Sequence, residues 1–349
     1  MSENGIVAET AARICADFAD PQEITRAKDG AWKEPLWRAL AEAGLTLAWV
    51  PEAHGGAGGD ISDGFAILSV AGRYALAVPL AETLLAGWLL SRAGIAAPEG
   101  AMSVAPARPS DRLTLNPDGT LSGKARAVPF AREANHLAVL AGASVALVET
   151  AACHIADGES LAGDPSNTVT FERVTPIHVA PAPAGFDQTS LMLMGCAVRS
   201  VQTAGALEAI LDMTVRYANE RVAFERPIAK FQAVQHSLAR LAGEVAAALT
   251  ASSSAADAIA HADSFDDGIF LEATAAKIRS AEAAQEGAAI AHQMHGAIGF
   301  TNEHALHRYT LRLLAWRDDF GNESHWAVAL GNKIAARGAD EFWPLIAAR

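Results

Sequence analysis

Long helical patterns fill the C-terminal half of the chain, and they constrain the fold more than any other feature. Apolar side chains recur from Val234 to Leu249 at intervals of 4, 3, 4 and 4 residues, which gives one apolar helix face. Residues 270–295 form another alanine-rich helical pattern, which ends at Gly296 as helices commonly do. Pro227 interrupts the chain ahead of both patterns, because proline lacks a backbone donor. Such long helices bury their apolar faces against one another, so this half is predicted to be a helical bundle.

Residues 101–185 have a different pattern, in which short apolar runs alternate with turn sequences. Leu137–Ala141 and Val145–Val148 are two such runs, and turn dipeptides stand at Asp118-Gly119 and Ser122-Gly123. No long helical pattern separates the runs, as parallel βαβ units would require. These residues are therefore predicted to form a small β domain rather than a doubly wound sheet.

Helical patterns return in residues 1–100, on both sides of a glycine-rich loop at 51–60. The loop has the composition of either a phosphate cradle or a tight connection, but the Gly-Lys-Ser that follows a phosphate loop is missing. The chain is therefore predicted to be an α+β multi-domain protein. Its parts are an N-terminal helical domain (1–100), a small middle β domain (101–185) and a C-terminal helical bundle (186–349).

The net charge narrows the range of partners. The chain carries 40 acidic against 27 basic residues, a formal net charge of −13. Nucleic acids and anionic membranes attract clustered cations, so neither is expected as the main partner. The cysteines Cys15, Cys153 and Cys196 lie far apart with no Cys-x-x-Cys pair, which predicts neither a metal site nor a disulfide scaffold.

A cytoplasmic location is expected, because sparse cysteines suit a reducing compartment and the first residues show no signal-peptide pattern. The most apolar segment, from Tyr74 to Ile95, contains Pro79, Glu82 and Arg92. Those residues favour a buried helix over a membrane span.

Candidate ligand-binding residues begin where the helix before Pro227 is expected to end. The guanidinium of Arg221 can hold a phosphate through two hydrogen bonds, and Phe224 can stack on a purine. Gln232 follows near the start of the next helix. Alone, the pattern favours an ordinary ion pair for Arg221 and a polar helix position for Gln232.

A second candidate segment ends the helix over 270–295. Gln293 lies in its last turn, and Gly296 and Ala297 follow, with Gly299 close behind. Small residues allow a backbone to approach a diphosphate and to point its N–H groups toward it. The plainer interpretation is a glycine that caps the helix.

Together, the two segments resemble the acyl-CoA dehydrogenase family. The pattern Arg-x-x-Phe-x-x-Pro-Ile-x-x-Phe-Gln-x-Val-x-His starts at Arg221, and Gln-x-His-Gly-x-x-Gly-Phe-Thr starts at Gln293, 72 residues later (293 − 221). Pro51-Glu52 and His54-Gly55-Gly56 resemble the family's N-terminal motif, and the order of helical, β and helical domains agrees as well.

That resemblance implies an FAD-dependent enzyme whose C-terminal domain is a four-helix bundle. It implies that six residues contact an FAD held mainly by a neighbouring subunit: Arg221, Phe224, Gln232, Gln293, Gly296 and Ala297. The chain would then assemble as a homodimer, a homotetramer or a heterotetramer with another acyl-CoA dehydrogenase subunit. An electron-transfer flavoprotein is the implied electron acceptor.

The implied reaction is α,β-dehydrogenation of an acyl-CoA thioester to the trans-2-enoyl-CoA. A carboxylate removes an α-proton while the β-hydrogen leaves as hydride to the flavin. Because the α-proton is only weakly acidic, the base must be positioned and partly desolvated. The thioester carbonyl also needs hydrogen-bond donors to stabilise its developing charge.

The sequence departs from the family at the catalytic base. The family's usual glutamate falls on Phe320, and the alternative position used by some members falls on Gly195, 26 residues before Arg221. Neither residue can accept a proton. Residues 105–111 stand where the family has a stretch that contacts flavin and substrate, without matching it, and Glu225 replaces a common glycine.

Asp318 and Asp319 are the nearest alternative bases, since a shift of one residue would bring Asp319 to the flavin. Adjacent carboxylates also hold protons more readily than isolated ones, which suits a general base. Asp319 is equally suited to cap a helix beginning near Asn322 or to pair with Arg317.

Three functions remain open. The first is an active FAD-dependent acyl-CoA dehydrogenase whose base is Asp319. The second is a non-catalytic or half-site subunit of a heteromeric acyl-CoA dehydrogenase, of the kind that degrades steroid or ring-containing acyl-CoAs. The third is a flavin-free relative that acts as a scaffold.

Overall fold

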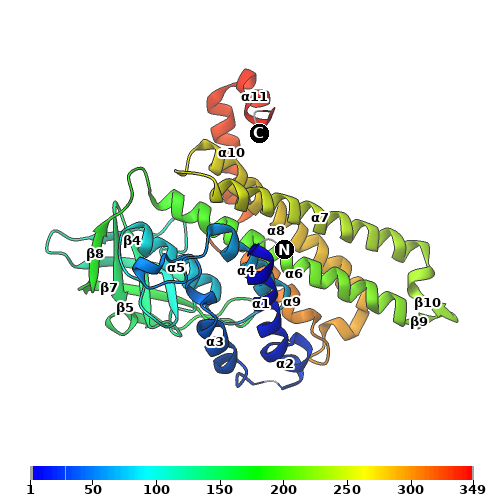
Figure 1. The fold of residues 1–349 in the computed structure, drawn as a ribbon. Coiled ribbons are helices and arrows are strands. Elements are labelled where there is room, and N and C mark those ends of the chain that lie inside the picture. The colour runs from blue at the N-terminus through cyan, green and yellow to red at the C-terminus, as the bar shows by residue number, and fades with distance from the viewer. Residues whose placement is uncertain (1–2, 28, 348–349) are drawn as a thin grey trace.

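The computed structural model describes residues 3–27 and 29–347. Helical regions precede and follow two sheets along the chain, and in space the sheets lie at one side of the molecule (Figure 1). The predicted α+β fold class is therefore confirmed. One continuous hydrophobic core joins the N-terminal helices, the sheets and the first part of the bundle. Within the described ranges, no helix is long and apolar enough to cross a membrane.

The N-terminal region is helical, as predicted. Leu36 and Leu40 are fully buried on one helix face. After the glycine-rich loop the helical stretch is divided in two, and Pro79 stands directly before the second of these helices. The glycine-rich loop is a tight connection, since a Cβ at Gly56 would lie 2.0 Å from the carbonyl oxygen of Val50. The helices are α1 (Glu3–Phe18), α2 (Pro21–Ala27), α3 (Lys33–Glu42), α4 (Ile61–Arg73) and α5 (Leu80–Arg92).

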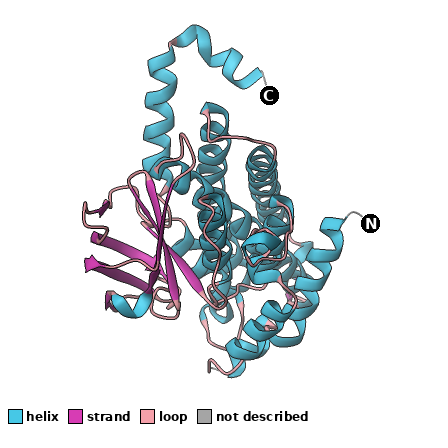
Figure 2. Ribbon diagram, turned by 60° about the vertical axis from the view of Figure 1, so that its left-hand side comes forward, coloured by secondary structure: helices cyan, strands magenta, loops and turns pink. Residues whose placement is uncertain are grey.

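Two four-stranded sheets form the middle region and lie beside the helices (Figure 2). The first has the order β1-β4-β5-β8, in which only β1 and β4 are parallel. Its strands are β1 (Met102–Ala105), β4 (His136–Ala141), β5 (Ser144–Glu149) and β8 (His178–Pro181). The second is antiparallel, in the order β2 (Leu113–Leu115), β3 (Leu121–Pro129), β7 (Ser166–Val174) and β6 (His154–Ala156).

The C-terminal region is the predicted bundle. Leu241 and Val245 are buried on the apolar stripe, and the last long helix ends before Gly296, whose φ of 64° is left-handed. The bundle helices are α6 (Gln188–Glu220), α7 (Gln232–Ala260), α8 (Asp267–His295) and the shorter α9 (Leu306–Trp316). Two further helices, α10 (Glu323–Arg337) and α11 (Phe342–Ala347), project away from the bundle (Figures 1 and 2).

Candidate functional site

One end of the bundle gathers the predicted cofactor-binding segments. α6 ends, α7 begins and α8 ends there (Figure 1). The ring of Tyr217 on α6 stacks on that of His295 on α8, with 4.5 Å between their centroids. The Arg221 and Gln293 segments, far apart in the chain, therefore lie at the same end of the molecule. We call this region the open end.

A strained hairpin at the open end presents one aromatic side chain to solvent. β9 (Val222–Ala223) and β10 (Arg226–Pro227) pair across a two-residue turn in which Phe224 and Glu225 both have positive φ, 51° and 67°. Such turns favour Gly or Asn, and the left-handed conformation costs other residues about 1–3 kcal/mol each. Phe224 is 89% exposed. The turn therefore holds a large apolar ring in water although its backbone conformation is unfavourable for both residues.

Glu225 has no ion-pair partner among the described residues. The guanidinium of the adjacent Arg226 lies over the ring of Phe231 instead, 4.3 Å from its centroid. The turn therefore presents a carboxylate beside the exposed ring of Phe224, and Arg221, also exposed, stands at the end of α6.

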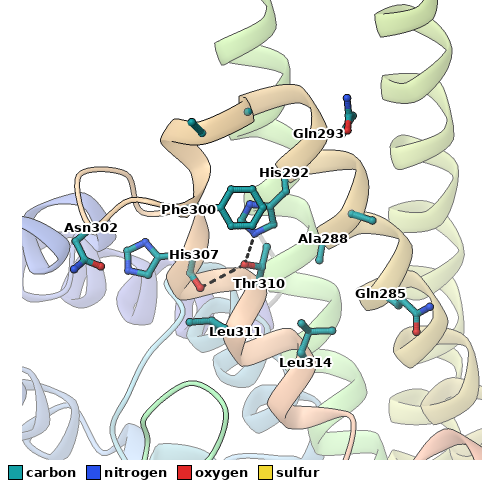
Figure 3. Close-up of a pocket in the computed structure, with 13 residues that line it drawn as sticks. Gln285, Ala288, His292, Gln293, Phe300, Asn302, His307, Thr310, Leu311 and Leu314 are labelled. Carbon is teal, nitrogen blue, oxygen red and sulfur yellow. Dashed lines mark hydrogen bonds between the residues drawn. The ribbon is translucent and has the colours of Figure 1, made fainter.

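A groove of about 950 Å³ lies between α8 and α9 at the open end (Figure 3). This volume is within the range of about 300–1,000 Å³ that is usual for small-molecule sites. Gln293, Gly296 and Ala297 line the groove, so the structure brings three of the six predicted cofactor-binding residues together. The other three, Arg221, Phe224 and Gln232, are outside its lining.

The predicted catalytic positions lie elsewhere, between the first third of α6 and the turn after α9. Gly195 precedes Arg221 by 26 residues, which corresponds to about 39 Å along a helix. Phe320 is 1% exposed, and its ring packs directly onto Gly195, where a Cβ would lie 2.3 Å from a ring carbon. The two residues that replace the family's bases therefore fill one space together. We call this region the closed end.

The backbone of Phe320 is fixed from both sides. Its N–H donates to the carbonyl oxygen of Ala107 at 3.2 Å, and its carbonyl accepts from the indole N–H of Trp326 at 3.0 Å. Its φ of 56° is left-handed, which a bulky side chain rarely adopts. These contacts hold the phenyl ring in the interior.

Asp319 is part of a buried ion-pair network. Its Oδ2 lies 2.8 Å from Nε of Arg199, which is 3% exposed and also donates to Glu82 and Gln202, at 2.5 Å each. Burial alone would lower the pKa of Arg199, but the two carboxylates outweigh it and raise that pKa. The predicted alternatives for Asp319 are not formed, because Arg317 pairs with Glu323 and the Asn322 side chain caps α10.

A buried lysine supports the same turn. Nζ of Lys277 donates to the carbonyl oxygens of Trp316 and Asp319, at 2.6 and 2.8 Å. Burial lowers the pKa of this lysine. Asp318, in contrast, is exposed, and it lines a cavity of about 260 Å³ with Arg108 and His325. That cavity, beside residues 105–111, is smaller than an ordinary ligand pocket.

Several functional candidates are missing from the predicted set. Glu82, Arg199 and Lys277 are buried at the closed end, and their signal in the sequence is a charge that directly follows two apolar residues. His292 and Phe300 stack within the groove, at 4.1 Å between centroids. The signal for Phe300 is the Gly299-Phe300 pair of the motif, and His292 directly precedes that motif.

Models of two protein-family domains match most of the chain. "Acyl-CoA dehydrogenase, N-terminal domain" matches residues 2–97, and "Acyl-CoA dehydrogenase, C-terminal domain" matches residues 185–321. Among curated proteins, the acyl-CoA dehydrogenase IpdE2 of Mycobacterium tuberculosis is 30% identical over 316 residues. That match covers 89% of this chain and 90% of the relative.

Solved structures show the same similarity. The ChsE4-ChsE5 complex from Mycobacterium tuberculosis has a chain that superposes with a TM-score of 0.85 at 22% identity, covering 96% of this chain and 98% of that one. A variant of the Tcur3481-Tcur3483 steroid ACAD superposes with a TM-score of 0.84 at 26% identity, covering 97% and 99%.

Proposed function

The chain belongs to the acyl-CoA dehydrogenase family, and from that membership we propose that it is a subunit without a catalytic base, which completes the FAD site of a catalytic partner subunit. The observation that carries this proposal is the closed end. The buried ring of Phe320 lies against Gly195, so both positions from which the family supplies a base are apolar. A phenyl ring and a glycine can neither remove an α-proton nor orient a water to do so.

The two aspartates are poor substitutes. Asp319 would have to leave its ion pair with Arg199, and breaking a buried pair costs about 3–5 kcal/mol. Asp318 is exposed, whereas the base for a weak carbon acid has to be partly desolvated. This chain's own residues thus hold their charges in a structural network rather than at a reaction centre.

The chain's residues fit one side of an FAD site. At the open end, Arg221 can hold a diphosphate and Phe224 is free to reach another subunit, whereas the cavity at the closed end is too small for a flavin beside an acyl group. The FAD, bound mainly by the partner subunit, supplies the hydride acceptor. Arg221 contributes charge-assisted hydrogen bonds there, each worth about 1.5–3 kcal/mol.

The partner proposed is another acyl-CoA dehydrogenase subunit, in a heterotetramer that oxidises a steroid or other ring-containing acyl-CoA. Two structural neighbours support this assembly: the ChsE4-ChsE5 complex and the Tcur3481-Tcur3483 steroid ACAD. An electron-transfer flavoprotein is proposed as the acceptor of the electrons.

Co-expression tests this function. The chain is purified alone and with an acyl-CoA dehydrogenase subunit that carries the family's glutamate, and flavin absorbance is followed as acyl-CoA is added. We expect acyl-CoA to cause no loss of flavin absorbance in the lone chain. The co-expressed complex should be yellow and should lose its flavin absorbance when acyl-CoA is added. In the complex, Asp319→Asn in this chain should leave bleaching intact, while glutamate to glutamine in the partner abolishes it. The opposite result would be a lone, FAD-loaded wild-type chain whose flavin absorbance bleaches with acyl-CoA, together with an Asp319→Asn variant whose absorbance does not. That result would establish an active dehydrogenase.

A further inference from the structure

We propose that Arg308 and Arg312 on α9 form a binding site for a small oxyanion, a phosphate or a carboxylate. The two residues are four positions apart, so their side chains project from the same face of the helix. Neither residue lines the groove between α8 and α9, and neither belongs to the predicted cofactor-binding set. The site is therefore independent of the proposed function. We call the two residues the arginine pair.

Three regions of the chain meet at the arginine pair. Nη2 of Arg312 donates to Oδ1 of Asp164, in the loop between β6 and β7, at 2.6 Å. Nη2 of Arg308 makes only a long hydrogen bond, 3.5 Å, to the carbonyl oxygen of Ala75, between α4 and α5. Its guanidinium also lies 5.8 Å from the ring centroid of Trp32, directly before α3. The pair thus lies where the bundle contacts both the N-terminal helices and the β region.

The arginine pair carries more positive charge than its surroundings neutralise. Arg312, whose side chain is 4% exposed, is paired with Asp164. Arg308 is only partly exposed, and among the described residues it forms no ion pair. Burial lowers the pKa of Arg308 to about 10, and the charge of Arg312 acts in the same direction, whereas Asp164 raises that pKa. Arg308 therefore remains charged near pH 7, as an unbalanced cation in a chain of net charge −13.

Two donors of the pair also lack an acceptor. Nε of Arg308 and Nε of Arg312 are buried, and neither has a hydrogen-bond partner among the described residues. A buried donor without an acceptor is unfavourable, and native proteins contain few of them. A guanidinium presents its N–H groups in a planar fork that matches the oxygens of a phosphate or a carboxylate. A bound oxyanion would supply acceptors and negative charge at the same place.

Such an anion would stabilise the junction between the three regions. Arg308 is partly exposed, which gives access from solvent, whereas the burial of Arg312 restricts the ligand to a small one. The unfolded chain has no such junction, so the anion would bind the folded chain in preference. Stability should therefore rise with the oxyanion concentration.

Melting curves of the full-length wild-type chain test the site. They are recorded at one pH over a series of sodium phosphate or sodium acetate concentrations, with sodium chloride added to keep the ionic strength constant. We expect the melting temperature to rise with the oxyanion, and the concentration dependence gives a dissociation constant. A larger effect of phosphate assigns the site to phosphates, and a larger effect of acetate assigns it to carboxylates. A melting temperature that responds to neither anion at constant ionic strength would overturn the proposal.

Arg308→Gln is the decisive variant, because it removes the unbalanced charge and leaves the pair of Arg312 and Asp164 intact. The dissociation constant should rise about 10- to 150-fold, the range that one charge-assisted hydrogen bond gives. Without oxyanion the variant should melt no lower than the wild-type chain, since it no longer buries an unbalanced cation. Arg308→Lys keeps the charge without the planar fork and should weaken binding less. Arg240→Gln is the control, because its pair with Glu286 is exposed and its anion response should equal that of the wild-type chain.

Equal dissociation constants for the wild-type chain and Arg308→Gln would refute the site, as would the same loss of binding in Arg240→Gln. A clear drop in the melting temperature of Arg308→Gln without oxyanion would also refute it. That drop would show that the contacts of Arg308 with Ala75 and Trp32 already satisfy its charge. The chain is measured alone and without FAD, so this site and the proposed function can fail separately.

Discussion

The two ends of the helical bundle use their large side chains in opposite ways. At the open end, Phe224 and Phe300 are 89% and 70% exposed, beside an uncharged groove of about 950 Å³. At the closed end, Phe320 is 1% exposed and Arg199 3%, and the adjoining cavity measures about 260 Å³. The aromatic rings at the open end are accessible to a ligand or a partner, whereas at the closed end the ring fills the interior and the buried charges are paired.

That contrast separates two tasks that an acyl-CoA dehydrogenase usually combines. The first is to hold the cofactor, and the second is to remove the α-proton of the substrate. The open end has the groups with which a subunit can hold part of a cofactor. At the closed end Asp319 is held in an ion pair, Asp318 is exposed, and the adjoining cavity is smaller than an ordinary ligand pocket. Under the proposed function, this chain has kept the first task and leaves the second to its partner.

Arg199→Met gives the largest expected effect. It leaves the buried carboxylate of Glu82 and the partly exposed carboxylate of Asp319 without their cation, so the free energy of unfolding should fall by about 3–5 kcal/mol. Urea unfolding followed by circular dichroism measures it. Arg240→Met is the matched control, because its pair with Glu286 is exposed and should contribute no more than about 1 kcal/mol. Similar losses in both variants would show that the closed end is not a stabilised interior.

Gly195→Ala should have a smaller but more specific effect. Alanine normally stabilises a helix interior by about 1 kcal/mol relative to glycine, but here the new methyl group would collide with the ring of Phe320. We expect a net loss of about 1–3 kcal/mol from overpacking. A control is Gly243→Ala on α7, where no atom lies within 4 Å of the new Cβ and a slight gain is expected.

The Phe320→Leu background makes the Gly195 test decisive. Loss of the aromatic ring should reduce the penalty of Gly195→Ala, so a double-mutant cycle should give a coupling of about 0.5–3 kcal/mol. Additive effects would mean that the ring does not fill the space above Gly195. The urea unfolding assay used for Arg199→Met provides all four measurements.

Local patterns in the sequence predicted much more of the open end than of the closed end. The end of α8 at Gly296 and the break near Pro227 follow from the backbone limits of glycine and proline, which act within a few residues. The partners of Asp319 and Gly195 could not be found that way. The ion-pair partner that the sequence offers for Asp319 is Arg317, two residues away, whereas its partner in the structure is Arg199, 120 residues away. Contacts between charges and rings in a core depend on tertiary packing, so local patterns in a single sequence do not reveal them.

A histidine in the turn before α9 should make the open end sensitive to acid. His304 accepts a hydrogen bond from the N–H of Leu306 through Nδ1, at 3.1 Å, and lies against the ring of His295. Burial lowers its pKa to about 4, with further contributions from His295 and His307, whereas an unfolded histidine titrates near 6.5. Between those values the unfolded chain binds more protons than the folded chain. Stability from His304 is therefore complete above about pH 6.5 and is lost as the pH falls toward 4.

His304→Asn isolates that contribution, because asparagine can still accept from the Leu306 N–H but cannot be protonated. We expect the free energy of unfolding to decline less steeply in the variant than in the wild-type chain between pH 6.5 and 4. Burial raises the pKa of Glu82 at the closed end, which acts in the opposite direction as the pH falls, but its effect cancels in the difference between the two proteins. Urea titrations at several pH values provide the two slopes. Parallel slopes would mean that His304 titrates normally, and that the open end is no more acid-sensitive than the ion-paired interior of the closed end.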